Sequence, residues 1–356
     1  DYYASRGLGD VYKRQIKKFV KEGLVVLGPT PEYSPSLVNY PTADREVQKM
    51  ASELWAHSSY GKGKVFSEKY SLADVFAAVA LSPDCKISDG APISFIHRTT
   101  DEGDIYFLSN QSNDFTSFKA TFRVSGKQPE LWNPLTNEIR ILPEYTEANS
   151  SITIPLQLES CESTFIIFRN AEEKTVTGKN YPQPYVLTTI HTPWKVKFEE
   201  RRQGPKESVV FNTLTDWITS EDPRIKYYSG TADYTNTFTI KEIPSQPTYI
   251  NLGKVVAMAK VYLNGKYVGG AWTYPYRLNI TDYLQKGENT VKIEVVNNWV
   301  NRLIGDLKLP AEQRSTWTMV NPWRDDSQLQ SSGLFGPVRI ESHDYELLKF
   351  SPLSDN

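Results

Sequence analysis

The sequence predicts a mostly β protein, in which a partial α/β segment is followed by two β-sandwiches. The spacing of apolar residues is helical up to about residue 81 and changes to a period of two from Pro92 onward. Short alternating runs then recur at intervals of about 8–12 residues, separated by Asn, Gly, Pro and Ser clusters, which is typical of sandwich folds. Asn264-Gly265 divides two such runs. This dipeptide indicates a β-hairpin, because a type I′ turn needs positive φ at both central positions.

The start of the chain has no clear periodicity. Residues 9–15 (GDVYKRQ) resemble translated adaptor read-through, so we expect residues 1–15 to be non-native and to adopt no fold. Ile16, Phe19 and Val20 then stand at helical spacing, and Gly23 follows at the position where helices commonly end.

Helices and strands are expected to alternate through residues 16–90. Residues 24–27 and 64–66 indicate short strands, and residues 47–55 indicate an amphipathic helix with Thr42 or Asp44 as its cap. A further helix is expected over residues 72–81, with Ser71 as its cap. This segment is too small for a complete doubly wound domain, so we interpret it as the remnant of a flavodoxin- or amidotransferase-like α/β domain.

The β part is expected to form two domains. Residues 91–170 contain about seven short alternating runs and predict a β-sandwich. Residues 171–190 are polar and contain prolines, so we interpret them as a linker. A second sandwich is expected over residues 191–345, followed by a tail at residues 346–356.

Charge and composition argue against several kinds of partner. The chain has 40 basic and 42 acidic residues and a net charge of -2, so no basic surface for nucleic acid is expected. The apolar runs are much shorter than the roughly 20 residues that span a bilayer. Cys85 and Cys161 are too few for a disulfide framework, and the four histidines are too scattered to predict a zinc site. The sequence therefore leaves any metal site unknown.

The first candidate site lies within the first sandwich. His97 and Arg98 end a predicted strand just before an acidic turn, where they would reach a substrate at a domain junction. The alternative is an ordinary hairpin whose histidine has its hydrogen bonds satisfied.

The second candidate follows the strand that ends near residue 296, where the alternation is lost. Asn298, Asn301 and Arg302 carry groups that match vicinal sugar hydroxyls, and Trp299 offers an apolar face to a sugar ring. The alternative is a structural ion pair between Arg302 and Asp306 beside a buried tryptophan.

A third candidate has a similar composition. Residues 317–326 contain Trp317, Trp323 and Asp325 in a dense stretch with few strand residues, ahead of a closing strand. These side chains suit sugar binding in the same way, and the alternative is a structural crossover.

Several motifs carry a family resemblance. Residues 261–266, 280–289, 294–297 and 332–338 resemble, in order, the galactose-binding-like jelly roll of the family 2 glycoside hydrolases. Residues 28–37, 225–232 and 301–306 are similar to the family 106 α-L-rhamnosidases.

The resemblance implies the C-terminal part of a bacterial, exported enzyme that hydrolyses terminal α-L-rhamnosyl linkages in plant-type polysaccharides or oligosaccharides. Its catalytic barrel would precede these residues, and the catalytic carboxylates and signal peptide are expected to be lost with that portion. The enzyme would be periplasmic or extracellular. The resemblance implies calcium in the parent enzyme, while no cofactor is expected in this fragment. The remaining domains would support the barrel and contact sugar.

Three alternatives stay open at this point. The chain would otherwise be a carbohydrate-binding module, the accessory domains of a family 2 β-glycosidase, or a purely structural sandwich.

Overall fold

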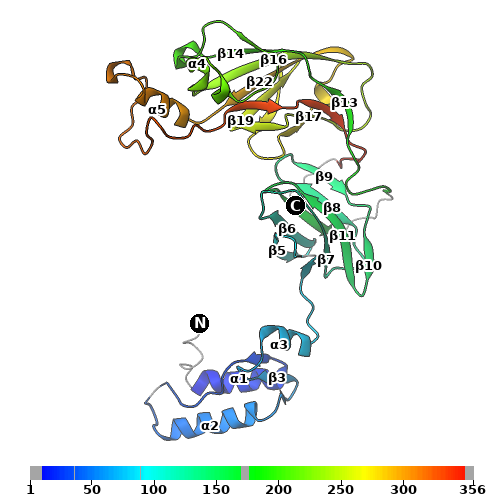
Figure 1. The fold of residues 1–356 in the computed structure, drawn as a ribbon. Helices are drawn as coiled ribbons and strands as arrows, with labels where there is room; N and C mark the ends of the chain where they lie inside the picture. Colours follow the sequence, from blue (N-terminus) through cyan, green and yellow to red (C-terminus); the bar gives the residue numbers. More distant parts are fainter. Residues whose placement is uncertain (1–9, 36, 89, 170–175, 349–356) are drawn as a thin grey trace, which may run out of the picture. The chain divides into compact units, whose positions relative to one another are not determined.

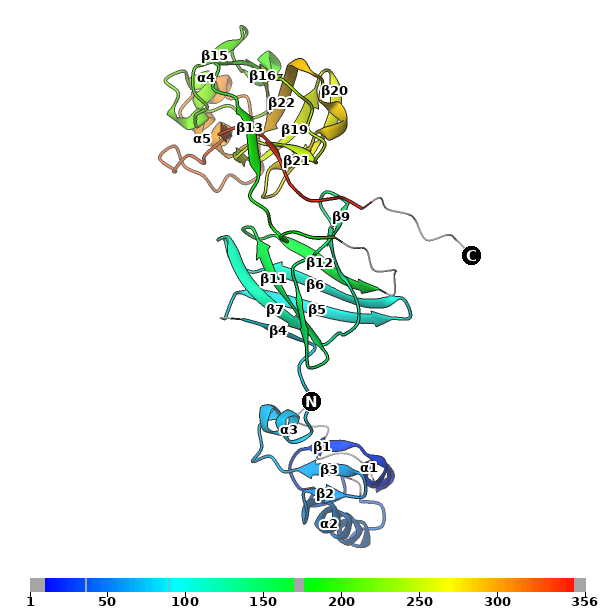
Figure 2. The same cartoon turned by 90° about the vertical axis from the view of Figure 1, so that its right-hand side faces the viewer.

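A computed structural model describes residues 10–35, 37–88, 90–169 and 176–348. The chain divides into two compact units, Asp1–Pro83 and Asp84–Asn356, which we describe separately. Figures 1 and 2 show their elements in two views.

The first unit is a small α/β layer. Its elements are α1 (Asp10–Glu22), β1 (Val25–Leu27), α2 (Thr42–Trp55), β2 (Ser59–Tyr60), β3 (Gly63–Phe66) and α3 (Leu72–Ala78). The sheet has the order β1-β3-β2, with β1 parallel and β2 antiparallel to β3. Val20, Leu54 and Val65 form its core.

The predicted helices are present, with two corrections. α1 begins at Asp10, so the expectation of no fold was wrong for residues 10–15, while residues 1–9 lie outside the described residues. Pro41 occupies the N-cap of α2, so neither Thr42 nor Asp44 caps it. The Asp44 carboxylate instead accepts a hydrogen bond of 2.8 Å from the Ser34 amide. Ser71 caps α3 as predicted, in a capping box with Asp74.

The second unit begins with a two-layer β-sandwich. Its strands are β4 (Cys85–Ile87), β5 (Ile93–Thr100), β6 (Gly103–Asn110), β7 (Thr116–Phe122), β8 (Pro129–Asn133), β9 (Glu138–Ile141), β10 (Thr146–Ala148), β11 (Ser151–Leu158) and β12 (Ser163–Arg169). The sheets have the orders β10-β11-β7-β4 and β5-β6-β12-β8-β9. Alternate residues of β11 are buried, and large side chains such as Tyr106, Phe122 and Phe168 fill the space between the layers.

The sandwich starts earlier than the boundary expected at residue 91. Cys85 pairs with Phe122 and is buried in the sandwich core, which makes β4 an edge strand of the first sheet. A strand of three residues is too short to show an alternating pattern, so β4 could not be predicted from its sequence.

The rest of the unit is a jelly roll. Its strands are β13 (Tyr185–Thr189), β14 (Trp194–Phe198), β15 (Val209–Phe211), β16 (Thr231–Ile240), β17 (Thr248–Asn251), β18 (Lys254–Val256), β19 (Met258–Leu263), β20 (Lys266–Ala271), β21 (Arg277–Asn279), β22 (Gly287–Val296), β23 (Gly333–Gly336) and β24 (Arg339–Ser342), with helices α4 (Pro223–Lys226) and α5 (Val300–Leu307). The two main sheets run β15-β14-β16-β22-β19-β20 and β13-β24-β17-β21.

Local turn chemistry fixes the register of this domain. Asn264 and Gly265 have φ values of 51° and 77°, as a type I′ turn requires, and Leu263 pairs with Lys266 across the turn. Val291 and Ile293 on β22 are completely buried beside Trp194 in one core. The fold class predicted from the sequence is therefore confirmed.

The predicted linker at residues 171–190 is partly wrong. Strand β13 pairs with β24, and Ile190 is buried in the jelly-roll core. Asn180 is also buried, where its side chain donates to the Glu144 carbonyl at 2.7 Å. The chain from Asn180 onward therefore packs as part of the folded unit, while residues 170–175 lie outside the described residues.

The expected tail also begins with an ordered contact. The Leu348 amide donates to the Ile139 carbonyl at 2.7 Å. This pairs Leu348 with β9 of the sandwich in an isolated antiparallel bridge. Residues 349–356 lie outside the described residues. No helix in the described part of the chain is long and apolar enough to cross a membrane.

Candidate sugar-facing site

The segment after β22 leaves the sheet through an asparagine. Asn297 donates to the Tyr228 carbonyl at 2.8 Å and accepts from the Gly230 amide at 3.0 Å. These bonds to the backbone before β16 satisfy the side chain, so Asn297 fixes the point at which α5 departs.

Asn298 and Asn301 both anchor a returning segment of chain. Asn298 donates to the Gln330 side chain at 2.8 Å, and Asn301 exchanges two hydrogen bonds with the Gln330 backbone, at 2.6 and 2.8 Å. Asn301 is only 1% exposed. Its amide is thus already used within the protein, whereas the sequence suggested a sugar contact.

Asp306 anchors the chain leaving α5. Its carboxylate accepts from the amides of Ser315 and Thr316 at 2.9 and 2.8 Å, and from both of their hydroxyls. Arg302 lies 3.6 Å from Asp306 and donates to the Gln203 side chain at 3.0 Å. The ion-pair alternative is therefore confirmed for Arg302 and Asp306.

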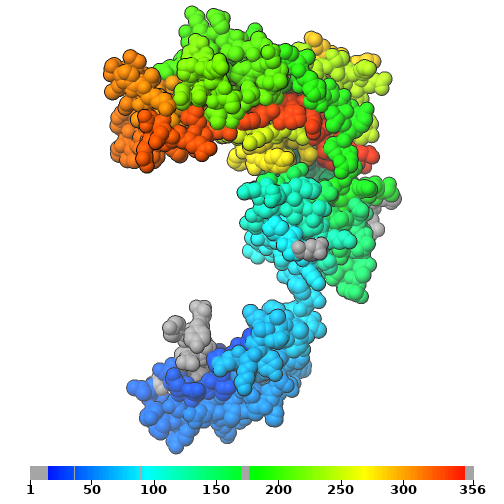
Figure 3. Space-filling view, viewed as in Figure 1, coloured from blue at the N-terminus to red at the C-terminus, as the bar shows by residue number. Residues whose placement is uncertain are grey.

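Between these anchors, residues 308–332 form what we call the tryptophan loop. Trp317, Met319 and Val320 in this loop are 85%, 85% and 75% exposed, and Trp299 at the start of α5 is 70% exposed. The expectation of a buried tryptophan beside the ion pair was thus wrong. Figure 3 shows the segment from α5 through the loop, in orange, as a lobe on the surface.

The remaining residues of the third candidate differ in exposure. Trp323 is half-buried and Asp325 is exposed. The loop ends where the Ser332 amide donates to the Asp216 carboxylate at 2.9 Å. A loop held at both ends and apolar in its middle is suited to contact another surface or a sugar.

His97 and Arg98 lie on β5 in the sandwich and not with the tryptophan loop. The His97 ring stacks on Tyr106 with centroids 4.1 Å apart, and its nitrogens lie 3.4 Å from Asp84 and 3.2 Å from Asp104. Arg98 is exposed and donates to the carbonyl of His97. His97 therefore has the satisfied arrangement of the structural alternative.

The carboxyl groups beside His97 make the sandwich sensitive to acid. Arg123 holds the pKa of Asp84 below its usual range. At Asp104 burial opposes ionisation, but hydrogen bonds from Lys127, His97 and Thr99 outweigh it and lower the pKa. A lowered carboxyl pKa stabilises the fold above the unfolded-state pKa of about 3.9, and this stability is lost as the pH falls through the folded-state pKa.

Replacing Asp104 by asparagine is expected to lower the free energy of unfolding at pH 7 by about 1–3 kcal/mol, the range for hydrogen bonds to charged groups. The difference from the unaltered protein should shrink between pH 7 and pH 3. Urea denaturation at several pH values measures it, with the exposed Asp101→Asn as a matched control. A difference that stays constant with pH would contradict this explanation.

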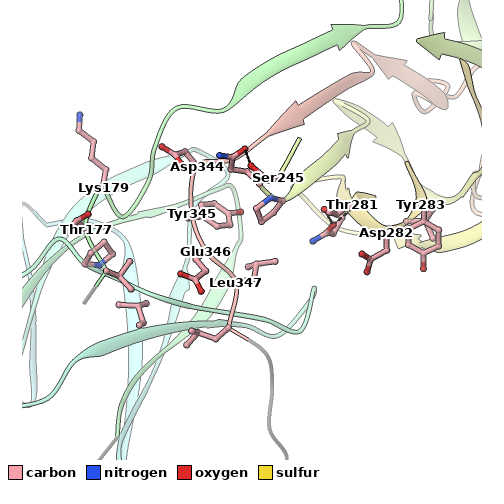
Figure 4. A pocket seen from close by; sticks show the side chains of 18 residues that line it. Thr177, Lys179, Ser245, Thr281, Asp282, Tyr283, Asp344, Tyr345, Glu346 and Leu347 are labelled. Carbon is pink, nitrogen blue, oxygen red and sulfur yellow. Dashed lines mark hydrogen bonds between the residues drawn. The ribbon is translucent and has the colours of Figure 1, made fainter. Parts of the chain in front are cut away.

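A wide cavity of about 1000 Å³ lies elsewhere in the unit, between the sandwich, residues 176–179 and the jelly roll. Figure 4 shows polar side chains around it, among them Lys179, Asp282, Asp344 and Glu346. None of the ten site residues predicted from the sequence lines this cavity.

The resemblance implies calcium in the parent enzyme. In the described part of the chain, no three or more His, Cys, Asp or Glu side chains come together as a metal-binding group. Calcium prefers six to eight oxygen ligands that include carboxylates, so these residues do not fit a carboxylate-rich calcium site.

Comparison with known proteins gives the chain its class. Residues 7–147 match the family model described as alpha-L-rhamnosidase, of glycoside hydrolase family 106. Residues 208–325 match the model described as glycosyl hydrolase 2 galactose-binding domain-like. These two matches show that parts of the chain are similar to glycoside hydrolase sequences, and that the jelly roll is similar to an accessory galactose-binding-like domain.

The two family models match different parts of the chain. The family 106 match covers most of the first unit and most of the sandwich, and the family 2 match covers most of the jelly roll. The predicted resemblance is thereby confirmed.

Three individual relatives are also similar to this chain. A rhamnosidase from Novosphingobium sp. PP1Y superimposes with a TM-score of 0.86 at 34% identity, over 95% of this chain and 32% of that one. A putative beta-glucuronidase of Formosa agariphila is 24% identical, over 92% of this chain and 49% of its own length. A beta-galactosidase of Priestia megaterium is 31% identical, over 53% of this chain and 18% of its own. The chain thus spans half or less of the length of these relatives.

Proposed function

We propose that the chain supplies the accessory domains of an exported bacterial α-L-rhamnosidase, which hydrolyses terminal α-L-rhamnosyl linkages in plant-type polysaccharides or oligosaccharides. The observation that carries this proposal is the match to the Novosphingobium rhamnosidase, which extends over 95% of the chain at 34% identity. The putative beta-glucuronidase of Formosa agariphila matches a similar share of the chain but at 24% identity, and the family 2 match is confined to residues 208–325, so both support a β-glycosidase less well.

The chemistry itself is assigned to another part of the enzyme. Glycoside hydrolysis needs two carboxyl groups that face each other across the sugar, one as acid and one as base or nucleophile. None of the ten residues predicted for this chain is proposed in either role. We assign both to a catalytic barrel within the part of the relatives' length that this chain does not span.

The tryptophan loop is proposed to bring the polysaccharide to that barrel. An exposed indole offers an apolar face to the C–H side of a sugar ring. Because Asp306 and Asn301 hold both ends of the loop, Trp317 is presented on a fixed frame. A pre-organised contact loses less conformational entropy when the sugar binds.

Replacing Trp317 by alanine in the complete enzyme is expected to raise KM for a rhamnose-bearing polysaccharide by up to roughly tenfold, since aromatic contacts contribute about 0.5–1.5 kcal/mol. Turnover of an aryl α-L-rhamnoside should not change, because the proposed contact of Trp317 is with sugar residues that only the polysaccharide carries. Steady-state kinetics on both substrates measures the effect.

The matched control is Trp272→Ala, because Trp272 is also 70% exposed but lies outside the loop. An equal effect of both substitutions on the polysaccharide would contradict a role specific to the loop. Loss of aryl rhamnoside turnover in Trp317→Ala would instead indicate that the loop packs against the barrel.

A further inference from the structure

We infer that a second cavity, between the sandwich and the jelly roll, binds a small neutral saccharide. Its volume is about 410 Å³, within the range of roughly 300–1,000 Å³ that is typical of small-ligand pockets. Strands of both domains and residues 181–184 line it. The choice of ligand class rests on the proposed carbohydrate function.

Two buried polar groups that belong to the lining of this cavity make no hydrogen bond within the described residues. They are the Tyr181 hydroxyl, which lies near the Arg140 guanidinium, and Nε2 of His343. His343 is only 5% exposed, and its Nε2 lies 3.5 Å from a carboxylate oxygen of Glu341. An unpaired buried polar group costs about 1–3 kcal/mol, which a ligand hydroxyl would offset.

Two guanidinium groups are also free to bind. Arg277 on β21 and Arg339 on β24 line the cavity, and in the described part of the chain neither guanidinium has a hydrogen bond or an ion pair within 4.0 Å. Arg277 lies 5.2 Å from the centre of the Tyr249 ring, which holds its side chain beside the domain junction. A guanidinium donates in a planar fork, which suits the neighbouring hydroxyls of a sugar.

Carboxyl groups supply hydrogen-bond acceptors in the lining of the cavity. Glu159 and Glu162 line the cavity, and burial raises the pKa of both carboxyl groups. Glu341 is buried and accepts from Asn251 at 3.1 Å. Hydroxyl groups of a ligand would donate to these carboxylates.

The balance of charges selects a neutral ligand. Four carboxylates and three guanidinium groups line the cavity, namely Glu138, Glu159, Glu162 and Glu341 with Arg140, Arg277 and Arg339. A strongly anionic or cationic ligand would meet like charges at short range, whereas a hydroxyl both donates and accepts. Phe115, which is 55% exposed overall, adds an apolar side chain to the lining.

The larger cavity of Figure 4 is a weaker candidate. No described residue with an unpaired buried side-chain atom lines it. The smaller cavity is preferred because its unpaired donors are already buried.

Isothermal titration of the 356-residue chain with L-rhamnose, D-galactose and D-galacturonate tests the inference. We expect saturable binding of a neutral sugar, with affinity at least tenfold lower in Arg277→Ala and several-fold lower in Phe115→Ala. The matched control is Arg224→Ala, since Arg224 is exposed and pairs with Asp222 outside the cavity. Thermal unfolding of each variant checks that the fold is retained.

Four results would overturn the inference, three with the sugars and cavity variants and one with the tryptophan loop. The first three are no saturable heat with either neutral sugar, unchanged affinity in both Arg277→Ala and Phe115→Ala, and tighter binding of galacturonate than of the neutral sugars. Loss of binding in Trp317→Ala alone would also overturn it, because the tryptophan loop would then be the site. The proposed function is tested separately, by turnover in the complete enzyme, so failure of one can be told from failure of the other.

Discussion

Replacing Asp306 by alanine is expected to lower the free energy of unfolding by about 3–5 kcal/mol, the cost of removing one partner of a buried ion pair. The Asp306 side chain is 3% exposed and that of Arg302 is 9% exposed, so the remaining charge would be left in the protein interior. The amides of Ser315 and Thr316 would lose their acceptor as well. Urea denaturation followed by circular dichroism measures the change.

The same substitution should release the tryptophan loop. Hydrogen exchange of the Ser315 and Thr316 amides is expected to become faster in Asp306→Ala than in the unaltered protein. Asp306→Asn serves as the control, because it keeps one acceptor oxygen and should fall between the two. A loss of less than about 1 kcal/mol, with amide exchange unchanged, would show that Asp306 does not hold the loop.

Replacing Glu138 by alanine is expected to uncouple the sandwich from the jelly roll and to lower the free energy of unfolding by about 3 kcal/mol, at the upper end of the range for hydrogen bonds to a charged group. Glu138 on β9 accepts two hydrogen bonds across the domain junction, one from the Tyr249 hydroxyl at 2.6 Å and one from the Asn279 side-chain amide at 3.0 Å. Tyr249 is 1% exposed, so its hydroxyl would lose its acceptor in a buried place.

Differential scanning calorimetry of the chain measures this coupling. We expect the two β-domains to unfold together in the unaltered protein and in two separate transitions in Glu138→Ala. Glu138→Gln keeps an acceptor oxygen and should retain most of the coupling. One transition at an unchanged midpoint in Glu138→Ala would contradict a role for this residue in joining the domains.

Much of the fold could be predicted because its signals are local. The alternation in β22 and the Asn264-Gly265 turn lie within a few residues of one another, so strand, face and register follow from short stretches of sequence. β13 gave no such signal. It is a strand because it pairs with β24, about 150 residues further along the chain, and that pairing cannot be seen locally.

The candidate site was harder to predict because the partners of its side chains are also distant in the sequence. Asn301 and Asp306 have side chains that suit a sugar, but the fold places the Gln330 and Thr316 backbone against them. Composition identifies a polar side chain without showing whether the protein already satisfies its hydrogen bonds.

The residues of the inter-domain cavity were missed altogether. Arg277 and Glu341 lie on strands more than 60 residues apart and form no motif in the sequence. The one local hint is a charged residue within an apolar strand, as at Arg140 between Ile139 and Ile141. Such a residue indicates a polar partner on another element.

The proposed function is tested by the turnover of a panel of aryl glycosides, measured with this chain and with the complete enzyme that we propose contains it. We expect the complete protein to hydrolyse an aryl α-L-rhamnoside, and this chain alone to hydrolyse none of the panel. Hydrolysis of an aryl β-D-glucuronide or β-D-galactoside in place of the α-L-rhamnoside, or turnover by this chain alone, would contradict the account.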